Sequence, residues 1–169
     1  MAQSVELLLG AEAEGRIRYD WQALHGASLP SEYRPASASH RPHITLFAGP
    51  KVPEPESELA ELVRGVDGMT VRIGSVLLFG PRRGSYVMVR QVLPSVELLE
   101  LQQRVASWCG ALRGGQFGPG RWAAHVTLAR RMTADHLPRA LEVLTPGTIE
   151  TSVTGCRRWD GTARRDWLL

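Results

Sequence analysis

The sequence predicts a bilobal α+β domain with pseudo-two-fold symmetry, in which two antiparallel sheets flanked by helices enclose a central groove. Three observations support this. A phrase of histidine, aliphatic residue, threonine and leucine occurs at His43–Leu46 and again at His125–Leu128. Each copy is followed by the same expected order of helix, strand, arginine-bearing turn and strand. The number of residues from the motif histidine to the hairpin that follows it is nearly the same in both copies, which indicates a duplicated unit.

Length and composition indicate one domain over residues 1–169. A chain of 169 residues can build one substantial core but is short for two. A hydrophobic content of 43% with mixed charge excludes disordered and fibrous classes. No apolar run approaches the roughly 18 residues that span a bilayer, and the first nine residues lack the basic start of an export signal. We therefore expect a cytoplasmic, monomeric protein with no membrane partner.

The first elements follow from hydrophobic patterning. Residues 5–9 are apolar and predict a strand, whereas 11–25 repeat apolar residues at helical spacing and end at Gly26. Residues 28–40 are rich in proline and serine, which predicts a surface loop leading into the first motif strand. This loop could drape over a site.

Between the two motifs we expect two helices and a hairpin. Residues 53–66 begin with proline and acids and continue with apolar residues at helical spacing, which predicts a helix. The β-formers at 69–79 and 85–93 flank a turn at 80–84, as in a hairpin. Residues 98–112 again show helical spacing, after a possible serine cap.

The last elements repeat this order. The glycine-dense segment 113–120 lacks the Lys-Ser/Thr ending of a phosphate-binding loop and is expected to be a connector. A short helix is predicted over 134–144, and strands over 148–159 and 166–169. Three leucines of this helix are expected to face the core: Leu137, Leu141 and Leu144.

The motif residues can perform acid–base chemistry. Side chains alternate along a strand, so each motif presents its histidine and threonine on one face. Histidine titrates near neutrality, and the pair His43 and His125 could move protons in phosphodiester cleavage. Thr45 and Thr127 could hydrogen-bond the phosphate oxygens as charge develops, or they could simply be β-formers.

Other residues are weaker candidates. Arg130 follows the second motif, although strict alternation would turn it to the face opposite His125. Phe47, Trp122 and Tyr33 could stack on a base, but aromatic residues are more often part of a core. The remaining histidines are expected to be solvated or capping: His25, His40 and His136.

Charge and cysteine content give few further constraints. The net charge of +3 comes mainly from arginine, which binds phosphate well but can also reflect genome composition. The paired turns carry four arginines that are expected to be mainly solvated: Arg82, Arg83, Arg164 and Arg165. Cys109 and Cys156 are expected to be buried and unpaired. Because neither motif has a carboxylate or thiolate at ligand spacing, we expect no metal and no cofactor.

The phrases His43-Ile-Thr45 and His125-Val-Thr127 resemble those that define the 2H phosphoesterase superfamily. Their flanks and the opening strand are similar to its bacterial 2′-5′ RNA ligase-like branch. This resemblance implies a bilobal α+β fold, with His43 and His125 as the acid–base pair and Thr45 and Thr127 holding phosphate. Members act on 2′,3′-cyclic nucleotide ends, related cyclic phosphates or RNA 2′-5′ linkages, generally without metal. Arg130 matches an arginine often found after the second motif.

These observations lead to one main hypothesis and two alternatives. The main hypothesis is a metal-independent phosphodiesterase that opens a 2′,3′-cyclic phosphate on a nucleotide or RNA end, with His125 as base and His43 as acid. The sequence does not fix that order. One alternative is a ligase or nuclease of 2′-5′ RNA linkages, and the other is a non-catalytic protein that binds RNA or nucleotides.

Overall fold

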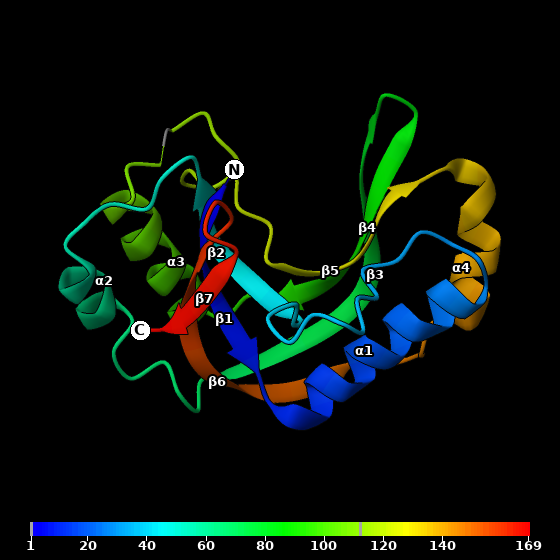
Figure 1. The fold of residues 1–169 in the computed structure, drawn as a ribbon, viewed down its shortest axis with the longest axis horizontal. Helices are drawn as coiled ribbons and strands as arrows, with labels where there is room; N and C mark the ends of the chain where they lie inside the picture. The colour runs from blue at the N-terminus through cyan, green and yellow to red at the C-terminus, as the bar shows by residue number, and fades with distance from the viewer. Residues whose placement is uncertain (1, 112) are drawn as a thin grey trace.

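The computed structural model describes residues 2–111 and 113–169. Within them the chain forms seven strands and four α-helices (Figure 1). The strands are β1 Gln3–Leu9, β2 His43–Gly49, β3 Thr70–Arg82, β4 Ser85–Leu93, β5 His125–Met132, β6 Ile149–Asp160 and β7 Arg165–Leu168. The helices are α1 Ala11–Gly26, α2 Glu56–Leu62, α3 Val96–Trp108 and α4 Leu137–Val143, the last preceded by a 3₁₀ turn at Ala134–His136.

The strands form one antiparallel sheet in the order β2-β1-β6-β3-β4-β5, with β7 paired to β6 on a side branch. The two predicted sheets are therefore joined. Strand β6 joins them because it is long enough to pair with β3 at its start and with β1 over the rest of its length. The strand order is symmetric about the β6–β3 pair, as expected for two similar units; the duplication itself stays a prediction.

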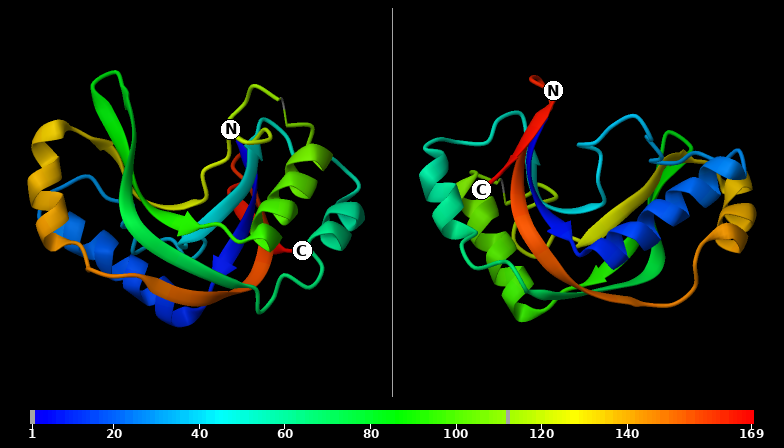
Figure 2. Two further views of the ribbon diagram at one scale, coloured as in Figure 1. Left: turned by 180° about the vertical axis from the view of Figure 1, so that it is seen from behind. Right: turned by 60° about the horizontal axis from the view of Figure 1, so that its bottom comes forward.

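The sheet is bent into a bowl with β6 along its base (Figures 1 and 2). Helices α2 and α3 lie together beside the β1–β2 half, and α1 and α4 lie together beside the β4–β5 half. Helix α1 follows β1 in the chain but contacts β5 in the other half. The outer, convex side of the bowl is thus covered by helices, whereas its concave side stays open.

The elements match the predicted order, but their ends differ. Helix α2 is shorter than the predicted 53–66, because Pro55 precedes its first turn and Gly65 adopts a φ of +79° soon after its end. Helix α3 begins at Val96, where the Ser95 side chain accepts a hydrogen bond from the Leu98 N–H. Its predicted end at residue 112 lies outside the described residues.

The inward face of α4 was predicted partly wrongly. Leu144 is buried, but Leu141 is 58% exposed, and Ala140 points into the core in its place. Successive residues of an α-helix are about 100° apart, so Leu141 points away from the direction of Ala140. The core lies on the Ala140 side of this helix.

None of the helices in residues 2–111 and 113–169 is both long and apolar enough to cross a membrane.

Candidate active site

The two motif strands, β2 and β5, stand at opposite ends of the strand order. The curvature of the sheet nevertheless brings them into contact across the concave side. The Trp122 indole N–H, which lies just before β5, donates to the backbone oxygen of Thr45 on β2 at 3.0 Å. In the same way, the Trp21 indole N–H of α1 donates to the backbone oxygen of Thr127 at 2.9 Å. Each motif threonine is therefore fixed by a tryptophan from another element.

Both motif strands contain a β-bulge at the same place. In the β1–β2 pair the register passes from Thr45 to Phe47, so Leu46 is the extra residue. In the β4–β5 pair it passes from Thr127 to Ala129, so Leu128 is the extra residue. A bulge reverses the alternation of faces for the residues that follow it.

The bulge decides where Arg130 points. Leu128 and Ala129 are both buried, and Arg130 is exposed, so Arg130 returns to the face that carries His125 and Thr127. Strict alternation, which would place it opposite His125, is therefore wrong here. The Arg130 side chain is 65% exposed and its Nε lies 3.2 Å from Glu32 Oε1.

The two imidazoles are held in the same way. Nδ1 of His43 lies 2.7 Å from the backbone oxygen of Arg41, and Nδ1 of His125 lies 2.6 Å from that of Ala123. Because a carbonyl oxygen can only accept, each Nδ1 carries the hydrogen and donates it. In both residues Nε2 is then the ring nitrogen that this backbone contact does not use.

The surroundings of His125 favour its neutral form. Burial lowers its pKa most, and the positive charges of His43 and Arg130 lower it further, against the raising effect of the Ala123 hydrogen bond. The Phe79 ring packs edge-on against the imidazole, with 4.9 Å between ring centres. His43 lies on β2 and His125 on β5, and these two strands contact each other.

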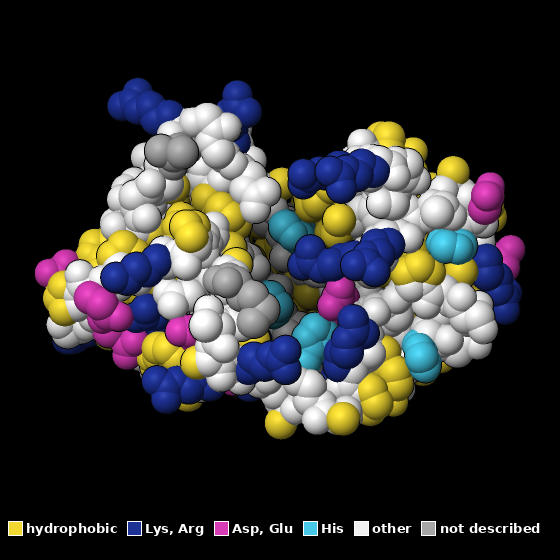
Figure 3. All heavy atoms as spheres, turned by 45° about the horizontal axis from the view of Figure 1, so that its top comes forward, with side chains coloured by type: hydrophobic (Ala, Val, Ile, Leu, Met, Phe, Trp, Pro, Cys, Tyr) yellow, Lys and Arg dark blue, Asp and Glu magenta, His cyan; other side chains and the backbone are white. Residues whose placement is uncertain are grey.

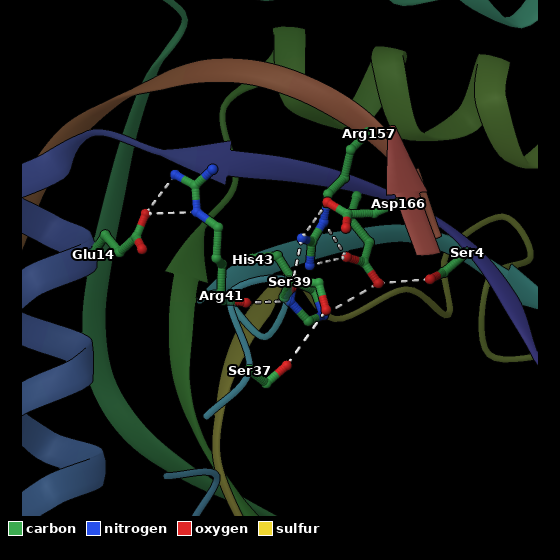
Figure 4. Close-up of polar contacts among 9 residues, drawn as sticks. Ser4, Glu14, Ser37, Ser39, Arg41, His43, Arg157 and Asp166 are labelled. Carbon is green, nitrogen blue, oxygen red and sulfur yellow. Dashed lines mark hydrogen bonds and ion pairs between the residues drawn. The ribbon is translucent and has the colours of Figure 1, made fainter. Parts of the chain in front are cut away.

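The surroundings of His43 carry a counter-charge. Glu6 Oε1 lies 3.5 Å from His43 Nε2, and Glu6 is only 5% exposed. Arg157 donates to Glu6 Oε2 from Nε at 2.9 Å, and Ser4 Oγ donates to Oε1 at 2.6 Å (Figure 4). Burial alone would raise the pKa of Glu6, but the His43 and Arg157 charges and these hydrogen bonds lower it overall. His43 therefore faces an ionised carboxylate.

Sequence reasoning missed Glu6 and Arg157. A signal was present at Glu6, because a carboxylate in an otherwise apolar strand needs a partner when buried. Its partner lies 151 residues away in the chain, and no local pattern connects the two.

The space-filling view shows histidine side chains in the hollow of the concave face (Figure 3). Lysine and arginine side chains line the right-hand and lower rim of the hollow in this view, with an acidic side chain among them, whereas the other acidic side chains lie mainly toward the sides. Such a distribution favours an anionic ligand.

The three aromatic residues predicted as possible base-stacking residues all make structural contacts. Phe47 is only 7% exposed and packs against Phe117 in the core, which corrects its assignment as a stacking surface. Tyr33 packs against the core and the ring of His25, and Trp122 packs against the core while donating to Thr45.

The other histidines have structural partners too. His40 stacks on Trp21 at 5.0 Å and its Nε2 lies 2.8 Å from the Glu32 backbone oxygen. His136 Nδ1 accepts the Thr133 backbone N–H, which is a cap of the following helix. The four turn arginines are exposed, as predicted: Arg82, Arg83, Arg164 and Arg165.

Cys109 and Cys156 are free and buried, as predicted, and burial raises the pKa of each thiol to about 12. Within residues 2–111 and 113–169, no three side chains of the metal-binding types histidine, cysteine, aspartate and glutamate gather in one place.

Comparisons with known proteins agree with this architecture. Residues 13–161 match the sequence profile of the family described as the 2′-5′ RNA ligase superfamily. The fold resembles that of TT0787 from Thermus thermophilus, with a TM-score of 0.53 and 18% identity over 100% of this chain and 95% of that one. It also resembles E. coli LigT complexed with 3′-AMP, with a TM-score of 0.55 and 18% identity over 99% of this chain and 92% of that one. The complex of the same E. coli protein with NADP+ has a TM-score of 0.51 and 17% identity, over 99% of this chain and 92% of that one. Among curated protein sequences, none matches this chain significantly.

Proposed function

Because this chain belongs to the 2′-5′ RNA ligase superfamily of 2H phosphoesterases, we propose that it opens 2′,3′-cyclic phosphates on nucleotides or RNA ends by paired histidine catalysis. Membership makes it a phosphoesterase-type enzyme; the cyclic substrate and the residue roles are our proposal. One observation carries it. The two imidazoles have their Nδ1 atoms fixed by equivalent backbone oxygens, which leaves each Nε2 for proton transfer, with Glu6 Oε1 lying 3.5 Å from His43 Nε2.

The different surroundings of the two histidines support the proposed roles, with His125 as base and His43 as acid. His125 is kept neutral, so it acts as the base that takes a proton from the attacking water. His43 lies beside the ionised Glu6, where an imidazolium has a counter-charge, so it acts as the acid. The two histidines thus have different electrostatic neighbours, which is the kind of asymmetry that an acid–base pair can use.

The reaction then balances with one water. The water oxygen forms a bond to phosphorus as its proton passes to His125 Nε2. The bond from phosphorus to one ribose oxygen breaks, and that oxygen receives the proton of His43 Nε2. The hydroxyls of Thr45 and Thr127 donate hydrogen bonds to the non-bridging oxygens, where negative charge increases. The product is a phosphate monoester.

A nucleotide partner is consistent with the likeness to E. coli LigT, whose structures contain 3′-AMP and NADP+. The basic rim of the hollow suits a phosphate group, and every proton transfer above uses a side chain of this chain. We propose no cofactor for these steps.

Turnover of adenosine 2′,3′-cyclic phosphate tests the proposal, with the product identified by phosphorus NMR. The wild type is expected to form a monoester, and His43→Ala and His125→Ala are each expected to lose turnover while retaining the circular dichroism spectrum of the fold. His25→Ala, an exposed histidine at the end of α1, serves as the matched control and should keep wild-type turnover. Near-normal hydrolysis by both site variants would refute the proposed acid–base pair.

The family description supports one alternative, the joining or cleavage of 2′-5′ RNA linkages. Incubation of RNA halves that carry a 2′,3′-cyclic phosphate and a 5′-hydroxyl distinguishes it, because ligation gives a longer product with a 2′-5′ bond. Tight binding of these RNAs without any product would instead indicate a non-catalytic binding protein.

A further inference from the structure

A second recess opens on the concave side, directly beside His43. It has a volume of about 300 Å³ and is lined by His43, Arg157 and Trp159 from the sheet and by Arg34, Ser37 and Ser39 from the loop that precedes β2. Figure 4 shows Ser37, Ser39, His43 and Arg157 around one small region. We call this recess the His43 pocket. Its volume lies at the lower end of the range for small-molecule sites.

The walls of the His43 pocket are held in place by buried contacts. Arg157, which is 3% exposed at its side chain, donates to the Ser39 backbone oxygen at 2.7 Å and to Asp166 Oδ2 at 3.0 Å. Arg157 also binds Glu6, so one guanidinium joins the loop to strands β1 and β7. A pocket formed before its ligand arrives loses less entropy on binding.

The charges of the pocket suit a neutral group. The charge of Arg157 is matched by Glu6 and Asp166, so it is not free for an additional phosphate. The lining further includes the indole of Trp159, the planar guanidinium of Arg34, the imidazole of His40, and the hydroxyls of Ser37 and Ser39. An aromatic face and a guanidinium plane stack on bases, and hydroxyls can hydrogen-bond the sugar.

The proposed roles of the histidines give the pocket a place in the reaction. His43 protonates the departing oxygen, and that oxygen belongs to the ribose of the substrate. The nucleoside must therefore lie on the His43 side of the phosphate. We infer that the His43 pocket binds the nucleoside of the substrate, with its base against Trp159. This inference rests on the proposed function and identifies Trp159 as a specificity residue.

The inference is tested by comparing two cyclic phosphates that share a five-membered ring and an alkoxide leaving group. Adenosine 2′,3′-cyclic phosphate carries a base, whereas glycerol 1,2-cyclic phosphate does not. Trp159→Ala is expected to lower kcat/KM about 10-fold for the nucleotide, the size expected when a stacked base loses its platform, and less than about 2-fold for the glycerol compound. Trp159→Phe keeps an aromatic ring and is expected to retain most of the preference, which separates stacking from misfolding.

Trp167→Ala is the matched control. Trp167 lies nearby on β7 but packs against the Arg158 and Arg165 guanidinium groups, away from the pocket, and its loss should leave the substrate preference unchanged. An equal loss for both substrates in Trp159→Ala, or no loss for either, would overturn the inference. A selective loss of the nucleotide in Phe79→Ala instead would place the nucleoside beside His125. If the wild type hydrolyses neither substrate, the proposed function fails and this role of the pocket fails with it.

Discussion

At the residue scale, the two motif histidines share a backbone anchor but differ in their neighbours. His125 lies beside Arg130 and the ring of Phe79, and His43 lies beside Glu6. The first environment disfavours a proton and the second provides a counter-charge for one. The asymmetry comes from residues outside the repeated motif, and it makes predictions for the pH dependence of catalysis.

The acidic limb of the pH profile should reflect His125. Because the pKa of His125 is lowered from 6.5, mainly by burial, the proposed base stays neutral to a lower pH than an ordinary histidine does. We expect kcat/KM for adenosine 2′,3′-cyclic phosphate to remain near its plateau at pH 6.5 and to fall only at lower pH. Arg130→Gln removes a positive charge, so the pKa of His125 should rise and the acidic limb should move to higher pH. A wild-type limb centred above pH 7 would contradict this assignment.

The motif threonines should contribute through their hydroxyls. Thr45→Val and Thr127→Val keep the shape and the β-branch but remove the donor, so each should lower kcat about 100- to 1000-fold, as for the loss of one oxyanion donor. Steady-state kinetics measure this loss. Thr70→Val, at an exposed position at the start of β3, is the matched control and should have no effect. Wild-type kcat in both motif variants would show that the two hydroxyls do not contribute to catalysis and that these threonines only favour the strand.

At the element scale, the paired bulges shape the site. Each one turns two successive residues into the core and then returns the strand to its former face. The first residue after the two buried ones is Arg130 on β5 and Ala48 on β2. Only the second motif therefore gains a positive charge beside its histidine. The bulge thus allows one strand pattern to present a third polar side chain beside its histidine and threonine.

A buried ion pair joins α1, β4 and the segment that follows α4. Asp20 of α1 accepts from Arg90 Nε of β4 at 2.8 Å and from the Thr145 backbone N–H, after α4, at 2.9 Å. Asp20→Ala leaves Arg90 buried without its partner, so we expect a loss of about 3–5 kcal/mol in the free energy of unfolding by urea. Breaking the exposed Arg72–Glu150 pair with Arg72→Ala should cost less than about 1 kcal/mol. Equal losses in the two variants would show that burial is unimportant here.

The sequence predicts strands and motif residues well because both follow from local patterns. Alternation and β-formers identify the strands, and repetition identifies the two histidines and threonines. The bulges leave no such mark, since Leu46 and Leu128 are ordinary strand residues, and the position of Arg130 was mispredicted for this reason. The exposure of Leu141 and the Glu6–Arg157 pair depend on packing between distant segments, which a local pattern does not contain.

At the scale of the whole molecule, the site exists only when both halves of the sheet are in place. β2 supplies one histidine, β5 supplies the other, and a tryptophan from another segment donates to the backbone oxygen of each motif threonine. Loss of the fold should therefore abolish activity, and forces that weaken the fold also weaken the site.

Acid should weaken the fold through two paired carboxylates, the buried Glu6 and the half-buried Glu14. The pKa values of Glu6 and Glu14 are lowered from 4.5, so their contribution to stability is complete above pH 4.5 and is lost as the pH falls through their folded values. The urea midpoint should therefore decrease below pH 4.5. Glu6→Gln should be less stable at pH 7, because Arg157 loses its ionised partner, but should show a smaller decrease with acid. A decrease as large as that of the wild type would exclude Glu6 as a source of acid lability.

The most direct test of the central claim, that both histidines act on one phosphodiester, is kcat for adenosine 2′,3′-cyclic phosphate in His43→Ala, His125→Ala and the double variant. Each single change should lower kcat at least about 100-fold, as expected for loss of a general acid or base. The double change should lower it little further, because groups that act as a unit do not contribute additively. Full multiplication of the two losses, or near-wild-type kcat in either single variant, would contradict the claim.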